Sequence, residues 1–65
     1  MKTPEQKREE ARLKAWDSLS RYKFLMFGYW AGAWVAFNDC CEQRYANPFA
    51  SLVHMARAQK EGGDK

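Results

Sequence analysis

Hydrophobic and polar positions divide the 65-residue chain into three parts. Residues 1–23 are rich in charge, whereas residues 24–37 hold no charged side chain and six of the ten aromatic residues. The remaining residues return to a mixed composition. Gln, Lys, Arg, Glu, Ala and Leu dominate the first part, and all of them favour helix. No segment alternates in the way a strand requires. We predict an all-α protein, a single small domain over residues 1–65.

The first helix has a clear start and no obvious end. Thr3 can cap it, Pro4 suits its first position, and Gln6 completes a capping box with Thr3. Residues 1–12 carry almost nothing apolar, so this part is predicted to be an arm that frays. Beyond it, the only candidate breakers before residue 46 are two glycines. We therefore predict one long helix over residues 4–45, with a bend at one of these glycines as the alternative.

The strongest break lies at Asn47-Pro48. Asn is a favoured cap and Pro a favoured first helical residue, whereas the residue before Pro is biased away from helix. A short helix is thus predicted over residues 48–60, with the stripe Phe49, Leu52, Val53 and Ala56 on one side. Residues 61–65 are predicted to be a flexible tail. The expected fold is a helical hairpin.

The long helix is apolar on every side along residues 24–37, so it needs cover all round. Gly28, Gly32 and Ala36 form a stripe of small residues, and a helical Gly costs about 1 kcal/mol relative to Ala. This stripe predicts close approach of another helix; the alternative is that the glycines relieve a crowded core. Because so short a chain covers its aromatics poorly, we predict a homodimer with a four-helix arrangement. The predicted dimer interface comprises Trp16, Leu19, Met26, Gly28, Trp30, Gly32, Ala33, Ala36 and Phe37.

Aromatic and arginine side chains outside that interface are candidates for binding a further protein, because such residues anchor protein interfaces. For each aromatic, the alternative is a place in the dimer's own core. The candidate partner surface comprises Tyr29, Trp34, Arg44, Tyr45, His54 and Arg57.

Charge and length leave two other functions open. The net charge of +3 arises in residues 1–23, where seven Lys and Arg face four Asp and Glu. Their signs alternate, which is typical of a solvated helix face. A small helix-turn-helix-like DNA-binding protein remains an alternative, with Ser51, His54, Arg57, Ala58 and Lys60 exposed. A single-span membrane protein is another, although fourteen apolar residues cover only about 21 Å of a core about 30 Å thick.

The sequence offers little chemistry. Cys40, Cys41 and His54 are its only soft metal ligands, whereas a zinc site requires four ligands. A Cys–His nucleophilic pair would need a third group to orient the His, and His54 is predicted on the outer side of its helix. We predict no catalytic residue, no metal and no cofactor. The charged N-terminus resembles no secretory signal, so a cytoplasmic location with free thiols is expected, with Cys41 as a small buried residue.

A family resemblance extends over about residues 15–58. It is carried by the run Ser20-Arg21-Tyr22-Lys23-Phe24-Leu25-Met26-Phe27-Gly28-Tyr29-Trp30-Ala31 and by Asn47-Pro48-Phe49. This pattern resembles the small early proteins of temperate lambdoid bacteriophages, encoded between the exonuclease and excisionase genes. The resemblance implies a regulatory protein, made early in a bacterial host, that binds host or phage proteins. It includes no motif that bears function, so no site residue is carried over.

Overall fold

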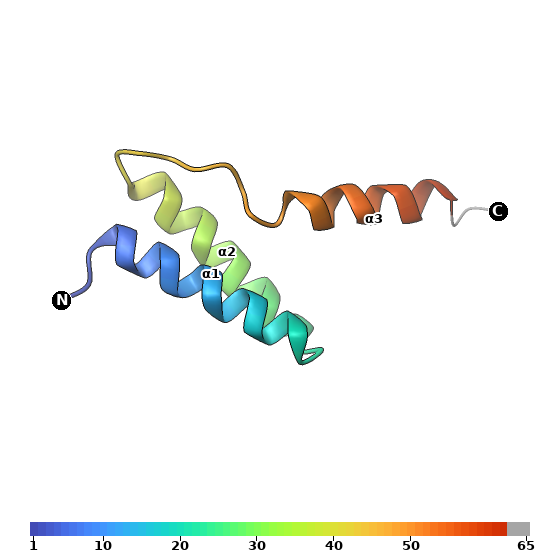
Figure 1. The fold of residues 1–65 in the computed structure, drawn as a ribbon, viewed down its shortest axis with the longest axis horizontal. Helices are drawn as coiled ribbons and strands as arrows, with labels where there is room; N and C mark the ends of the chain where they lie inside the picture. Colours follow the sequence, from blue (N-terminus) through green and yellow to red (C-terminus); the bar gives the residue numbers. More distant parts are fainter. Residues whose placement is uncertain (63–65) are drawn as a thin grey trace.

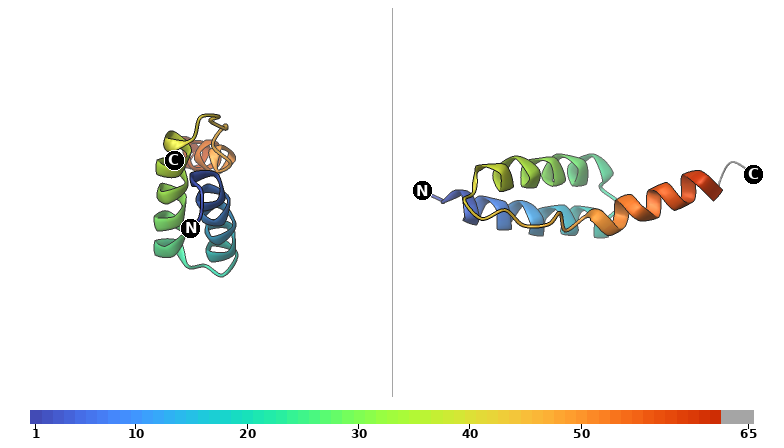
Figure 2. Two further views of the ribbon diagram at one scale, coloured as in Figure 1. Left: turned by 90° about the vertical axis from the view of Figure 1, so that its left-hand side faces the viewer. Right: turned by 90° about the horizontal axis from the view of Figure 1, so that it is seen from above.

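The computed structural model describes residues 1–62 and shows three helices, with no strand in that part of the chain. They are α1 (Pro4–Ser20), α2 (Phe24–Cys40) and α3 (Ala50–Gly62). Helices α1 and α2 run antiparallel and pack side by side, whereas α3 points away from them (Figures 1 and 2). The predicted all-α class is confirmed. The predicted second helix is present as α3, two residues later than expected at each end.

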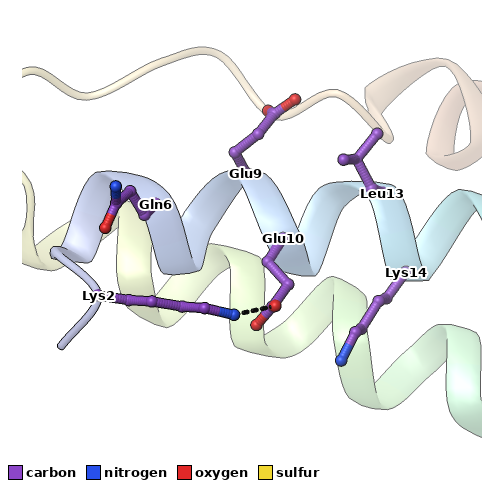
Figure 3. Close-up of a pocket in the computed structure, with 6 residues that line it drawn as sticks. All are labelled: Lys2, Gln6, Glu9, Glu10, Leu13 and Lys14. Atoms are coloured by element: carbon purple, nitrogen blue, oxygen red, sulfur yellow. Dashed lines mark hydrogen bonds and ion pairs between the residues drawn. The ribbon is translucent and has the colours of Figure 1, made fainter.

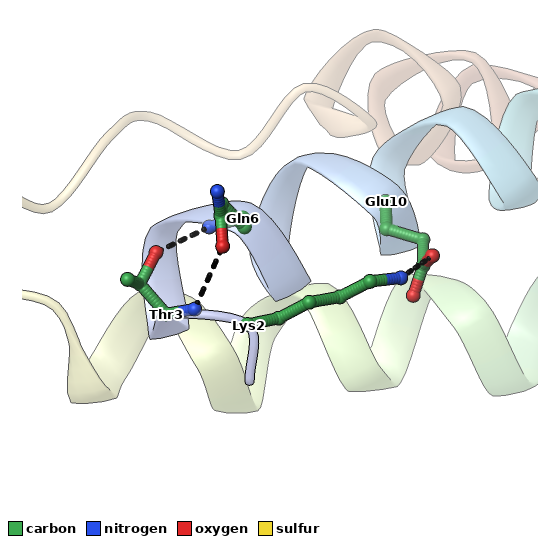
Figure 4. A network of polar contacts seen from close by, with 4 residues as sticks. All are labelled: Lys2, Thr3, Gln6 and Glu10. Atoms are coloured by element: carbon green, nitrogen blue, oxygen red, sulfur yellow. Dashed lines mark hydrogen bonds and ion pairs between the residues drawn. The ribbon is translucent and has the colours of Figure 1, made fainter.

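The predicted start of the first helix is confirmed in detail (Figure 4). The Gln6 N–H donates to Thr3 Oγ1 at 3.2 Å, and the Thr3 N–H donates to Gln6 Oε1 at 2.9 Å. Lys2 also reaches along the helix to form an ion pair with Glu10. The two Thr3–Gln6 hydrogen bonds satisfy backbone N–H groups that a helix N-terminus otherwise leaves without partners.

The prediction of one long helix over residues 4–45 is wrong, because the chain reverses at residues 21–23. Tyr22 adopts a left-handed φ of 62°. The Lys23 N–H donates to the Ser18 carbonyl at 2.9 Å, and the Tyr22 N–H donates to the Leu19 carbonyl at 3.1 Å. This bonding pattern is a Schellman motif, in which Gly usually occupies the left-handed position. Since Tyr stands there instead, the sequence carries no visible signal for the end of the helix. The alternative of a bend at a glycine is also wrong, because Gly28 and Gly32 both lie inside α2.

The reversal places side chains of the predicted dimer interface from both α1 and α2 around one core. Ala11 and Ala15 of α1 are fully buried and let α2 approach closely, with Trp34 and Phe49 completing the buried cluster. Trp16, Trp30, Ala33 and Phe37 of the predicted dimer interface pack against this cluster within the single chain. Much of the predicted dimer interface is therefore already covered without a second copy.

A buried polar cluster ties the chain after α2 back to α1. Arg8 Nη1 donates to Asn38 Oδ1 at 2.9 Å and to the Gln43 carbonyl at 2.8 Å. Asn38 also accepts from the Tyr45 N–H at 3.0 Å and donates to the Tyr45 carbonyl at 3.1 Å. The Arg8 guanidinium lies 4.1 Å from the centre of the Tyr45 ring. Residues 4–12, predicted to be part of a fraying arm, are thus helical here and held at Arg8, which is 5% exposed.

Helices α1 and α2 form the hairpin of this fold, in place of the predicted hairpin of residues 4–45 with 48–60. The start of α3 is fixed to the α1–α2 hairpin by Phe49. The Phe49 N–H donates to Asn47 Oδ1 at 2.8 Å, in keeping with a capping role for Asn47. Its ring lies 5.2 Å from Trp16, 5.4 Å from Phe27 and 6.3 Å from Trp34. Beyond this anchor and the half-buried Leu52, α3 leaves the hairpin. Of the predicted tail, residues 63–65 lie outside the described residues.

Tyr22→Gly should stabilise the protein. The left-handed conformation costs a non-glycine residue about 1–2 kcal/mol, part of which is offset by the greater freedom of Gly in the unfolded chain. Tyr22 is 80% exposed and gives up little packing. We expect a gain of about 0.5–1 kcal/mol, measured by thermal unfolding at fixed protein concentration. Arg21→Gly is the matched control and should destabilise, since Arg21 has a φ of −107°. An unchanged or lowered midpoint for Tyr22→Gly would show that the strain is absent.

Asn38→Ala should be strongly destabilising, because it leaves the buried Arg8 guanidinium and the Tyr45 backbone without their partners. We expect a loss of about 2–3 kcal/mol in chemical denaturation. Asp39→Ala, one residue along, is the control, because the Asp39 side chain is exposed and makes no hydrogen bond or ion pair within residues 1–62. Equal effects of the two substitutions would contradict the role assigned to the cluster.

Candidate interaction surface

The side of α2 that faces away from α1 is apolar and exposed. We call it the outer face; it comprises Phe24, Leu25, Gly28, Tyr29, Gly32, Val35 and Ala36. Leu25 is 92% exposed, Tyr29 64% and Phe24 63%. Asp39, near the C-terminal end, is the one charged residue of α2. Four of the ten aromatic residues are exposed and only two are buried. An apolar surface of this kind usually marks a site of interaction.

The two glycines of the outer face have open space beside them. A Cβ atom added at Gly28 or at Gly32 would meet nothing within 4 Å. The alternative that they relieve a crowded core therefore does not hold inside this chain. Their small size leaves a shallow strip along α2 on which another backbone could approach closely.

An apolar groove lies between α2, at the edge of the outer face, and the start of α3. Phe27, Ala31, Gly32 and Val35 form the α2 side of the groove. Leu52, Val53 and Ala56 form the α3 side, and Phe49 lies between the two. Asn47 is its only polar lining residue and no charged side chain lines it. The groove suits an apolar helix or side-chain cluster rather than a charged ligand.

The predicted dimer interface is divided by the fold. Gly28, Gly32, Ala36 and Met26 are exposed, with Met26 47% exposed. The other five residues of the predicted interface are half-buried. Four of them pack against the core of the single chain, namely Trp16, Trp30, Ala33 and Phe37, and the fifth is Leu19. Of the predicted dimer interface, the residues still open to a second copy are thus the small-residue stripe and Met26.

The predicted partner surface is also only partly on the outside. Trp34 is 3% exposed and belongs to the core, so it is not available at the surface of this chain. The remaining five residues are exposed, but they come from three separate segments: Tyr29 from α2, Arg44 and Tyr45 from the link between α2 and α3, and His54 and Arg57 from α3. The Tyr45 ring is engaged with Arg8.

Sequence reasoning missed Phe24, Leu25 and Val35 as surface residues. It also missed the second side of the groove on α3. The apolar character of residues 24–37 is visible in the sequence. If the first helix is read as continuing past residue 20, however, nothing shows which side of residues 24–37 is covered by residues 4–20. Once α2 begins at Phe24, the buried positions follow from a period of 3.6 residues.

A hollow on the surface of α1 carries charged side chains (Figure 3). It is lined by Lys2, Gln6, Glu9, Glu10, Leu13 and Lys14. A hydrogen bond from Arg12 lowers the pKa of Glu9, and one from Lys2 lowers the pKa of Glu10. These carboxylates are exposed, and exposed ion pairs contribute little to stability. Because its lining comes from one helix and the residues just before it, the hollow has no enclosing wall.

The thiols and His54 are not assembled into a chemical site. Cys40 is exposed and Cys41 is buried as predicted, both as free cysteines. The Cys41 thiol donates to the Phe37 carbonyl at 3.2 Å. Within residues 1–62, no group of three or more His, Cys, Asp and Glu side chains is placed to hold a metal ion.

None of the three helices in the described part of the chain has both the length and the apolar character needed to cross a membrane. No protein-family model matches the chain, and neither a curated protein nor a solved structure gives a significant match. The surface is therefore interpreted from its own chemistry.

Proposed function

We propose that this chain is a non-enzymatic interaction protein that forms a homodimer through the outer face of α2. The observation that carries the proposal is the exposed apolar face, with two glycines that have open space beside them. In a symmetric dimer the same face of both copies would be covered, so that the glycines of each meet the small residues of the other. Close backbone approach would then account for glycines that the single chain leaves unexplained.

The surface area of the single chain supports association. Its accessible surface is 5257 Å², whereas a compact monomer of this mass exposes about 4,300 Å². The excess of about 1,000 Å² is close to the area that each partner contributes to a standard interface, about 800 Å². A dimer would thus bring the exposed area per copy into the range of a compact protein.

In the proposed biological role, the dimer acts in the cytoplasm of a bacterial host as an early phage regulatory protein. The resemblance of residues 15–58 to small lambdoid early proteins motivates this role. The dimer would modulate host or phage development by binding a further protein. Tyr29 lies on the outer face itself, while Arg44, Tyr45, His54 and Arg57 remain accessible for such a partner.

The helix-turn-helix alternative finds less support in the geometry. That motif joins its two helices by a turn of about 3–4 residues. Here nine residues, 41–49, separate α2 from α3, and the two helices do not pack along their lengths. His54, Arg57 and Lys60 are exposed, but α3 also carries Glu61.

The first test is the solution mass of the detergent-free protein across a dilution series. We expect twice the chain mass at high concentration, with dissociation only on dilution. A mass of one chain at every concentration would refute the proposed dimer and leave the outer face open to another partner.

Gly32→Leu should weaken the dimer at least about tenfold in dissociation constant, because the larger side chain holds the two backbones apart. Gly32→Ala is the matched control, since it retains a small residue and replaces an unfavourable helical Gly. Both variants should fold, because the space beside Gly32 is open. Equal dimer affinity for native protein and Gly32→Leu, measured by sedimentation, would show that this glycine is outside the interface.

A further inference from the structure

Helix α3 lacks the support that a helix of its length needs. It has 13 residues, and isolated helices shorter than about 12–15 residues are marginal in water. It packs along neither α1 nor α2, and it extends outward beyond the hairpin (Figures 1 and 2). Its apolar residues continue past the Phe49 anchor: Val53 is 47% exposed and Met55 is 60% exposed. Tertiary packing that would stabilise α3 is missing from the single chain.

The apolar groove between α2 and α3 is likewise not filled by any side chain of the described residues. Phe27, Ala31, Gly32 and Val35 of α2 form one of its sides, the first turns of α3 form the other, and no charged side chain lines it. Each copy therefore holds an uncovered apolar groove and, along one side of it, the uncovered apolar side of α3.

We propose that the two copies of the dimer exchange α3, so that the groove of each copy receives α3 of the other. This inference rests on the proposed homodimer and specifies what fills its interface. A reciprocal exchange about a twofold axis is a closed arrangement, because each helix and each groove is used once. It leaves neither a free groove nor a free α3 on which a third copy could add.

Area and charge agree with this occupant. The excess surface of about 1,000 Å² per copy is close to what one partner contributes to a stable interface. Asp39 lies one helical turn beyond Val35 of the groove on α2, whereas Arg57 and Lys60 of α3 outnumber Glu61. Within residues 1–62, none of Asp39, Arg57 and Lys60 forms an ion pair in the chain. The charges that flank the two surfaces thus have opposite sign.

A matched pair of substitutions on α3 separates exchange from mere association. Both Ala56 and Ala58 are exposed in the single chain, but only Ala56 lines the groove. Ala58 lies two positions along, about 200° around the helix. Ala56→Glu should raise the dissociation constant of the full-length dimer at least tenfold, because a charge would be buried in an apolar groove. Ala58→Glu, which makes the same chemical change on the other side, should leave it within about twofold.

Disulfide trapping then locates α3. Two variants of the full chain, Val35→Cys and Ala56→Cys, each also carry Cys40→Ser to remove the exposed native thiol. When differently tagged chains are mixed and mildly oxidised, exchange predicts that the mixed pair cross-links faster than either like pair. The bond then joins α2 of one copy to α3 of the other.

The outcomes distinguish the two proposals. A dimer that tolerates Ala56→Glu, or in which Val35→Cys cross-links mainly to itself, would overturn the exchange and leave the homodimer standing. A native protein that is monomeric at every concentration would overturn both, and a different helix or a lipid surface would become the candidate occupant. The exchange would be supported if Ala56→Glu abolishes the dimer while Ala58→Glu does not, and if Val35→Cys cross-links mainly to Ala56→Cys.

Discussion

The packing of the Phe49 ring holds the three helices together. It touches Trp16 from α1 and both Phe27 and Trp34 from α2, at ring-centre distances between 5.2 and 6.3 Å. Helices α1 and α2 also meet along their lengths, but α3 is connected to them only where Phe49 and Leu52 pack on the hairpin. Burial of one aromatic side chain contributes about 1.5–3 kcal/mol, so the position of α3 rests on a small contact.

The core is small and lies on one side of α2. Ala11 and Ala15 bring α1 close to α2, and Trp34 fills the space between them. Two helices can cover only one side of each other, so a helix as apolar as α2 must leave the rest of its surface outside. The chain gains a defined hairpin in this way, at the cost of exposing large side chains such as Leu25 and Phe24. Association is the common physical remedy for such a surface.

Local signals in the sequence predicted the local structure well. The capping box at Thr3 and the break at Asn47 both depend on neighbouring residues, so they could be read directly. The reversal at Tyr22 could not, because tertiary packing enforces a left-handed conformation that Tyr itself disfavours. Arg8 and Asn38 are thirty residues apart, and their bond forms only once the hairpin exists. Because the reversal at residues 21–23 was missed, the predicted partner surface was partly wrong. The position of the reversal decides which residues of α2 are covered by α1, and Trp34 is one of them.

Gly32 links the two parts of the proposed assembly. It belongs to the small-residue stripe of the outer face and also lines the groove beside α3. A second copy that approaches along the stripe would therefore also reach the groove, and an exchanged α3 would lie against the same strip of backbone. Folding of α3 and formation of the dimer would then be one coupled equilibrium, because the helix lacks packing until the partner arrives. For such a protein, the stability of the C-terminal helix depends on protein concentration and not on the chain alone.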